Sequence, residues 1–180
     1  MKKIFILLVA SFICISCVTA QRVFTPLDAD SKVQFVIKNF GIKTRGNFKG
    51  LQGTIKFLPA NLAASAFEVT VDAATVDTDN ESRDDHLREA EYFDAAVFKT
   101  IRLISTKIVP STTAGRYYMF GNVTIKGVTK PVEFGFGATP KDGGYVFDGE
   151  FKINRRDFGV GGNSVSLSDN LTVSLSVLAR

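Results

Sequence analysis

Apolar and polar residues alternate with a period of two along most of the chain after residue 30. Such alternation is typical of β-strands that have one face in the core and the other in water. Eight segments show it: residues 32–38, 51–57, 67–72, 100–109, 117–125, 132–136, 145–153 and 171–177. Because each segment has a polar face that needs water, a parallel sheet buried on both sides is excluded. An antiparallel barrel or a two-sheet sandwich remains, and the barrel is favoured because closure removes both unpaired edges.

One stretch near the middle of the chain interrupts this pattern. Residues 81–98 begin with a charged run that contains neither Gly nor Pro, and this predicts one short exposed helix of about two turns. Ser82 is the expected N-cap. The aromatic residues Tyr92, Phe93 and Phe98 follow the helix, so the insert is expected to anchor at one end of the barrel.

The first twenty residues have the composition of a secretory signal peptide. Lys2 and Lys3 precede an apolar run that is too short to span a bilayer comfortably, and residues 18–20 have the small-x-small form that comes before a cleavage site. We therefore expect residues 1–20 to be removed and residues 21–180 to form one exported domain. An uncleaved anchor and a lipoprotein acylated at Cys17 are the less favoured alternatives, the latter because Cys14 stands where that signal usually has Leu.

Few groups that could carry out catalysis remain after cleavage. Both cysteines lie in the signal segment, so the mature chain has no disulfide, thiolate metal site or cysteine nucleophile. His86 is the only histidine, and no G-x-S-x-G motif accompanies it. One histidine beside Asp84, Asp85 and Glu89 is a weak zinc set. The sequence therefore predicts no catalytic residues, no metal site and no enzyme activity.

The charge of the chain argues against a nucleic-acid partner. The formal net charge of +4 falls to +2 when Lys2 and Lys3 are removed, and no basic stripe interleaved with aromatic residues is present. The sequence leaves the oligomeric state open, with a homodimer as one alternative.

The inward-facing positions of the strands are almost entirely apolar, and the chain has 16 Phe residues and no Trp. An eight-stranded barrel is about wide enough either to be filled by its own side chains or to hold one slender ligand, and both alternatives stay open on this pattern. If the lumen is open, its ligand must be apolar over most of its length. The predicted lumen residues are Phe35, Ile37, Ile55, Phe57, Phe67, Val69, Val71, Val123, Ile125, Phe134, Phe136, Phe147, Phe151, Val173 and Leu175.

Four sequence blocks carry a resemblance to a known family. They are RDDHLR (residues 83–88) followed by YFD (92–94), GNVTIKGVTKPV (121–132), INRRDFG (153–159) and GNF (46–48). With these blocks the chain, from residue 24 to residue 179, resembles the YceI-like family of secreted bacterial lipid-binding proteins. The resemblance implies an all-β fold, an eight-stranded antiparallel lipocalin-like barrel with one short helical insert, located in the periplasm or secreted. It also implies that the lumen binds a polyisoprenoid or a similar long-chain amphiphile without catalysis and without a cofactor other than the bound lipid.

Two hypotheses about function follow. In the first, the barrel carries or sequesters a polyisoprenoid, a quinone or a fatty-acid derivative, and Arg83, His86, Arg88 or Arg155 contacts its head group at the mouth. In the second, the protein is a solid-cored periplasmic stress or interaction protein without a small ligand. The four blocks then serve only the structure, because an Arg near a barrel rim is more often solvated or paired.

Overall fold

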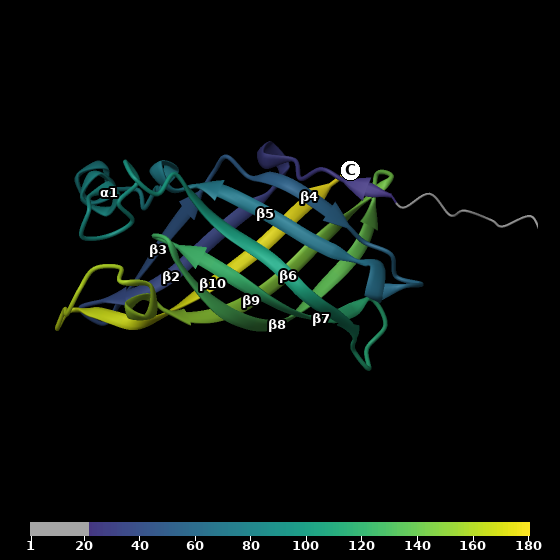
Figure 1. Ribbon diagram of the computed structural model, residues 1–180. Coiled ribbons are helices and arrows are strands. Elements are labelled where there is room, and N and C mark those ends of the chain that lie inside the picture. The colour runs from purple at the N-terminus through teal and green to yellow at the C-terminus, as the bar shows by residue number, and fades with distance from the viewer. Residues whose placement is uncertain (1–21) are drawn as a thin grey trace, which may run out of the picture.

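The computed structural model describes residues 22–180. Its strands are β1 (Val23–Phe24), β2 (Lys32–Asn39), β3 (Ile42–Phe48), β4 (Gln52–Lys56), β5 (Ala66–Asp72), β6 (Thr100–Pro110), β7 (Arg116–Ile125), β8 (Val128–Lys141), β9 (Gly144–Asn154) and β10 (Leu167–Ala179). This part of the chain has one α-helix, α1 (Glu81–Arg88), and four 3-10 turns, η1 (Asp28–Asp30), η2 (Leu62–Ala64), η3 (Ala73–Thr75) and η4 (Arg155–Phe158). All strands belong to one sheet in the order β1-β4-β5-β6-β7-β8-β9-β10-β2-β3, and every pair is antiparallel (Figure 1).

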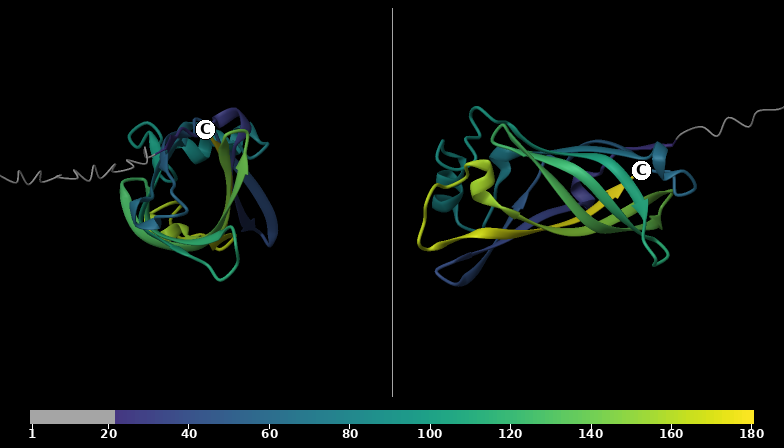
Figure 2. Two further views of the ribbon diagram at one scale, coloured as in Figure 1. Left: turned by 90° about the vertical axis from the view of Figure 1, so that its right-hand side faces the viewer. Right: turned by 60° about the horizontal axis from the view of Figure 1, so that its bottom comes forward.

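The sheet curls until its edge strands β1 and β3 come round towards each other, as the end-on view in Figure 2 shows. Short backbone bridges link the β1 end of the chain to the end of β10, and β3 to the segment after η3. Thr25 and Arg180 exchange two backbone hydrogen bonds of 2.7 and 3.1 Å, and Asn47 and Asp77 exchange two of 2.8 and 3.1 Å. The backbone N–H of Leu51 also donates to Asp28 Oδ1 at 2.8 Å. Loops and short bridges, rather than a continuous strand ladder, thus close the wall.

The predicted all-β class, the antiparallel pairing and the short helical insert are confirmed, with ten strands rather than eight. The sequence pattern missed β1 and β3. The regular alternation stops at residue 38, so the sequence indicates a loop at residues 39–46, but in the structure Phe40 and Gly41 form a two-residue hairpin turn with φ values of 49° and 78°. The absence of a side chain at Gly46 leaves room for the Phe35 ring, which would otherwise collide with a Cβ there.

Two other local predictions need correction. The apolar positions change phase after residue 72, a pattern that predicts a β-bulge, but the structure has the 3-10 turn η3 there, and Asp72 Oδ1 accepts the Ala74 N–H at 2.8 Å. A register shift does occur in β6 between Ser105 and Lys107, and it accounts for the poor alternation of that strand. The N-cap of α1 is Asn80 rather than Ser82.

Aromatic side chains fill the end of the barrel that lies away from α1. Phe57 is at the centre, with edge-to-face contacts that have ring-centroid distances of 5.1 Å to Tyr117, 5.2 Å to Tyr145 and 5.3 Å to Phe147. Phe67 and Phe136 complete this aromatic core through contacts with the same rings. Such pairs contribute beyond their buried area. This half of the barrel therefore has the solid interior that the second hypothesis predicted for the whole.

Candidate functional site

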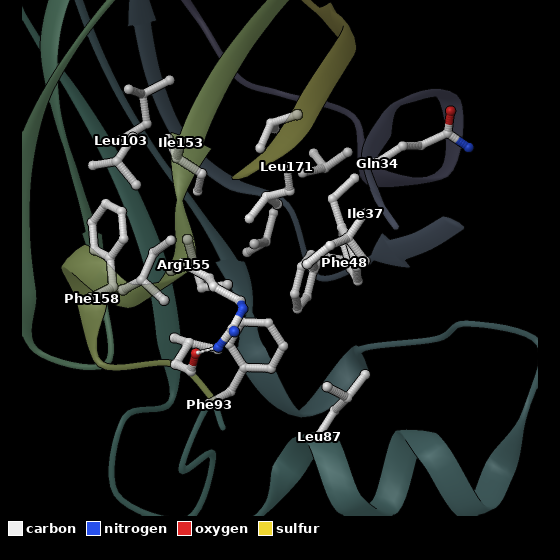
Figure 3. A pocket seen from close by; sticks show the side chains of 18 of the residues that line it. Gln34, Ile37, Phe48, Leu87, Phe93, Leu103, Ile153, Arg155, Phe158 and Leu171 are labelled. Carbon is white, nitrogen blue, oxygen red and sulfur yellow. Dashed lines mark hydrogen bonds between the residues drawn. The ribbon is translucent and has the colours of Figure 1, made fainter. Parts of the chain in front are cut away.

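The other half of the barrel, at the α1 end, contains a cavity. About 180 Å³ of it is open to the centres of water-sized molecules. Strands β2, β3, β5, β6, β7, β9 and β10 supply its wall, and the segments around α1 and η4 supply its outer end (Figure 3). Its apolar lining is Val33, Phe35, Ile37, Phe48, Leu51, Val69, Val71, Leu87, Tyr92, Phe93, Ile101, Leu103, Val123, Ile125, Phe151, Ile153, Phe158, Val160, Leu167, Leu171, Val173, Leu175 and Val177.

A stacked ring pair connects the cavity wall with the buried core. Phe134 and Phe151 stack with a centroid distance of 4.7 Å and an interplanar angle of 26°. Phe151 faces the cavity, whereas Phe134 does not line it. Phe151 therefore forms part of the cavity wall, and Val177, which pairs with Phe147 of the aromatic core, lines the cavity closer to that core.

Three apolar side chains narrow the outer end of the cavity. Leu87 is the only large aliphatic residue of α1, and it packs with Phe93 against the cluster around Phe35 and Val76. Phe48 of β3 meets Phe93 edge to face at 5.4 Å. Figure 3 shows Leu87 and Phe93 at this end, below the strands. The predicted role of the helical insert as a plug at one end of the barrel agrees with these contacts.

Polar contacts hold α1 over the cavity. Asn80 Oδ1 accepts the N–H of Arg83 at 2.9 Å and caps the helix. Arg83 Nε donates to Thr78 Oγ1 at 2.7 Å, and Arg83 Nη2 donates to Thr78 O at 2.6 Å. The buried carboxylate of Asp84 accepts the Thr78 N–H at 2.9 Å. One turn on, Arg88 donates to Ala74 O at 2.7 Å. Residues of the RDDHLR block (83–88) thus anchor the helix to residues 74–78.

Arg155 organises the loop on the opposite side of the outer end. Its side chain is only 3% exposed. Nη1 donates to the carbonyl oxygens of Val160, Gly161 and Gly162 at 2.8, 2.7 and 2.9 Å, and Nη2 pairs with Asp169 Oδ1 at 3.0 Å. Because protein acceptors occupy its donors, Arg155 has a structural role, although its side chain lies at the edge of the cavity.

The cavity has one buried polar atom without a partner. Among the described residues, Asn39 Oδ1 is the buried side-chain oxygen or nitrogen for which no hydrogen bond is found. Asn39 ends β2 and lines the cavity together with Thr44 of β3. An unpaired buried acceptor is costly, so this oxygen is a natural place for a donor on a ligand.

The structure divides the predicted lumen residues into two groups. One group lines the cavity: Phe35, Ile37, Val69, Val71, Val123, Ile125, Phe151, Val173 and Leu175. The other group is buried in the core and does not line the cavity: Ile55, Phe57, Phe67, Phe134, Phe136 and Phe147. The alternation of apolar and polar residues identifies side chains that face the inside of the barrel, so it found both groups. It does not show whether the interior at a given position is filled by side chains or left as a cavity.

The four residues predicted to contact a ligand head group also fall into two groups. Arg83 and Arg155 border the cavity, whereas His86 and Arg88 do not. His86 points outward, where Nδ1 lies 3.0 Å from Glu89 Oε2 and the ring packs on Tyr92 at 4.8 Å. The prediction missed several apolar lining residues, among them Leu103, Ile153 and Leu171, and the polar Asn39 and Thr44, which lie at the β2–β3 hairpin.

Residues 22–180 hold no cluster of three or more His, Cys, Asp or Glu side chains that could bind a metal ion. In the same range, no helix has both the length and the apolar character needed to cross a membrane. The predicted cleavage site and Cys17 lie outside the described residues.

Known proteins share this fold and sequence. A UPF0312 protein of Vibrio cholerae is 32% identical over 148 residues, which cover 78% of each chain. Protein YceI of Salmonella arizonae is 31% identical over 171 residues and 88% of each chain. The crystal structure of BcnA from Burkholderia cenocepacia superimposes with a TM-score of 0.81 at 27% identity, covering 86% of this chain and 99% of that one.

A fourth similarity is one of fold. A polyisoprenoid-binding domain from Saccharophagus degradans, implicated in plant cell wall breakdown, has a TM-score of 0.67 at 11% identity and covers 87% of this chain and 97% of its own. The model of the YceI-like domain matches residues 24–179, which is the same range that the sequence blocks indicated. With that match over nearly all of the described chain, the protein belongs to the YceI-like family.

Proposed function

We propose that the protein binds one long-chain amphiphile, of the polyisoprenoid, quinone or fatty-acid type, and carries or sequesters it without chemical change. The observation that carries this proposal is the apolar cavity at the α1 end, whose polar border groups are few and largely paired within the protein. The structural neighbour described as a polyisoprenoid-binding domain supports the same class of ligand.

The shape and chemistry of the cavity favour the chain of such a ligand over its head group. Burying a hydrocarbon chain gains about 0.8 kcal/mol per methylene, so an apolar tube can bind it tightly with little polar contact. Arg83 and Arg155 donate to protein oxygens, and Arg155 already faces the carboxylate of Asp169. A neutral or weakly polar head group at the outer end therefore suits the site better than a multiply charged one.

The direct test is organic extraction and native mass spectrometry of the mature protein purified from its own host. We expect one long-chain amphiphile per chain, and we expect the delipidated protein to take up a prenyl or acyl chain again. Failure of the delipidated protein to take up any such chain would favour the solid-cored alternative, for which the aromatic core is the specific observation.

The proposed function needs no catalytic group. His86 is exposed and pairs with Glu89 outside the cavity, so His86→Ala should leave both the fold and lipid retention unchanged. A turnover or a stoichiometric metal ion that this variant loses would contradict the non-catalytic assignment.

We further propose that the chain is exported and cleaved before Gln21, as its first twenty residues indicate. The intact mass of the protein from the envelope fraction tests this. A mass that retains residues 1–20, or a diacylglyceryl-modified Cys17 as the first residue, would show a different route.

A further inference from the structure

Three exposed apolar side chains gather beside the outer end of the cavity. Phe40 is 80% exposed and Ile42 is 72% exposed, both at the β2–β3 hairpin, and Val165 of the loop before β10 is fully exposed. The backbone N–H of Phe40 donates to Ser166 O at 2.8 Å, so hairpin and loop are joined. Figures 1 and 2 show the two segments projecting together at the α1 end of the barrel. We call Phe40, Ile42 and Val165 the rim tip.

The conformation of the hairpin turn does not explain why Phe40 is at its first position. Phe40 has φ of 49° and Gly41 has φ of 78°. Both values lie in the left-handed region, where hairpin turns of this kind strongly prefer Asn, Asp or Gly. A bulky aromatic residue in this conformation costs conformational energy and gains no burial in return. Such an outlier points to a role outside the fold.

Basic residues lie directly behind the rim tip. Lys38, Lys43 and Arg45 are exposed on the outer face of the same hairpin, and Lys38 and Lys43 are opposite each other in the register. Like charges across a strand pair are destabilising. No salt bridge within residues 22–180 involves these three side chains. Asp169 is the one acidic residue in the neighbouring loop and strand start, residues 159–169, and it is paired with Arg155 and Arg156.

We propose that the rim tip, together with the basic residues Lys38, Lys43 and Arg45, docks the protein on an anionic lipid bilayer. Aromatic and aliphatic side chains enter the boundary between head groups and acyl chains, while lysine and arginine contact lipid phosphates, which is the arrangement of interfacial membrane anchors. Glu81, Asp85 and Glu89 lie together on and just after α1, and α1 is on the other side of this end of the barrel from the hairpin (Figure 1).

Docking in this orientation would bring the cavity to the membrane. Asn39 pairs with Ile42 in β3 and with Leu167 in β10, and both Asn39 and Leu167 line the cavity. The outer end of the cavity is therefore one residue from the rim tip. The contact goes beyond the proposed ligand binding, since a bilayer can be recognised whether or not the cavity is occupied.

The test is flotation of the mature chain, residues 21–180, with vesicles of equal parts phosphatidylglycerol and phosphatidylethanolamine, and with pure phosphatidylcholine vesicles. The double variant Phe40→Asn/Ile42→Thr removes the apolar groups and keeps residues that suit the turn and the strand. We expect binding to the anionic vesicles that falls at least about tenfold in this variant. Lys38→Gln/Lys43→Gln should weaken binding at low salt and reduce its dependence on salt.

Tyr118→Thr is the matched control, because Tyr118 is an exposed aromatic residue of β7 outside the rim tip. It should bind like the wild type, and all variants should take up free lipid in solution, which separates docking from ligand binding. Equal vesicle binding by the wild type and the rim-tip variant, or no binding by the wild type, would overturn the proposal. A dimer that depends on Phe40 and Ile42, without vesicle binding, would instead make this face a contact between two copies.

Discussion

At the scale of single residues, Arg155 shows how one buried side chain can define a loop. Its guanidinium replaces water for three consecutive carbonyl groups that a tight turn rich in glycine could not pair by itself. The INRRDFG block is therefore explained by the backbone of residues 159–169. The sequence raised Arg155 as a candidate for head-group contact, and its occupied donors now favour the structural role.

Replacing Arg155 tests this role. Arg155→Met should lower the free energy of unfolding by at least about 2–3 kcal/mol, because several buried carbonyl groups lose their donors. Hydrogen exchange should become faster in residues 160–167. The matched control is the neighbouring Arg156→Met, whose half-exposed side chain makes one 3.5 Å pair with Asp169 and should change stability by less than about 0.5 kcal/mol. Equal effects in denaturant melts would contradict the special role of Arg155.

Asn39 is the complementary case, a polar side chain whose function is not explained by the fold. Asn39→Leu removes a buried oxygen without a partner, so the ligand-free protein should be more stable by about 1 kcal/mol. The variant should also bind a long-chain alcohol about tenfold more weakly, while its affinity for the methyl ether of that alcohol, which cannot donate, stays the same. Calorimetric titration of both ligands checks this. A destabilised variant, or an equal loss for alcohol and ether, would rule out Asn39 as a ligand acceptor.

At the scale of elements, the N-cap of α1 is a point where the sequence prediction and the structure differ. Asn80→Ala should cost about 1 kcal/mol, because the Arg83 N–H loses its acceptor at the first turn. Ser82, the cap expected from the sequence, lies inside the helix, so Ser82→Ala should be neutral or slightly stabilising. Thermal melts of the two variants give the comparison directly. The reverse order of stability would restore Ser82 as the cap.

The elements also show what alternation can and cannot reveal. Strands with a regular apolar face, such as β9 and β10, were found because the inward side chains of both share one core. Strand β3 was not predicted, because Lys43, Arg45 and Asn47 give it the polarity of a loop. In addition, its turn has Phe40 at a position where Asn or Asp would have indicated a hairpin. Cavity residues from β2, β5 and β10 were predicted, whereas Asn39, Thr44 and the packing of Leu87 depend on how distant segments meet.

At the scale of the whole molecule, the barrel combines both alternatives that the sequence left open. Phe57 and its ring neighbours fill one half, and the other half keeps an apolar cavity behind α1. The Phe134–Phe151 stack belongs to both, since Phe151 lines the cavity and Phe134 does not. Packing of the aromatic half can then provide rigidity, while the cavity half has room for the ligand proposed above without a change of fold.

A pair of tryptophan substitutions tests this division. Phe147 contacts Phe57 at 5.3 Å and Phe67 at 5.0 Å, so Phe147→Trp should overpack the aromatic core and cost about 1–3 kcal/mol. Ile153 lies on the same strand and faces the cavity, which has room for the larger ring. Ile153→Trp should therefore melt near the wild-type temperature without ligand and take up less lipid after delipidation. If both variants lose stability equally, or if Ile153→Trp takes up lipid as the wild type does, the cavity half is not the ligand site.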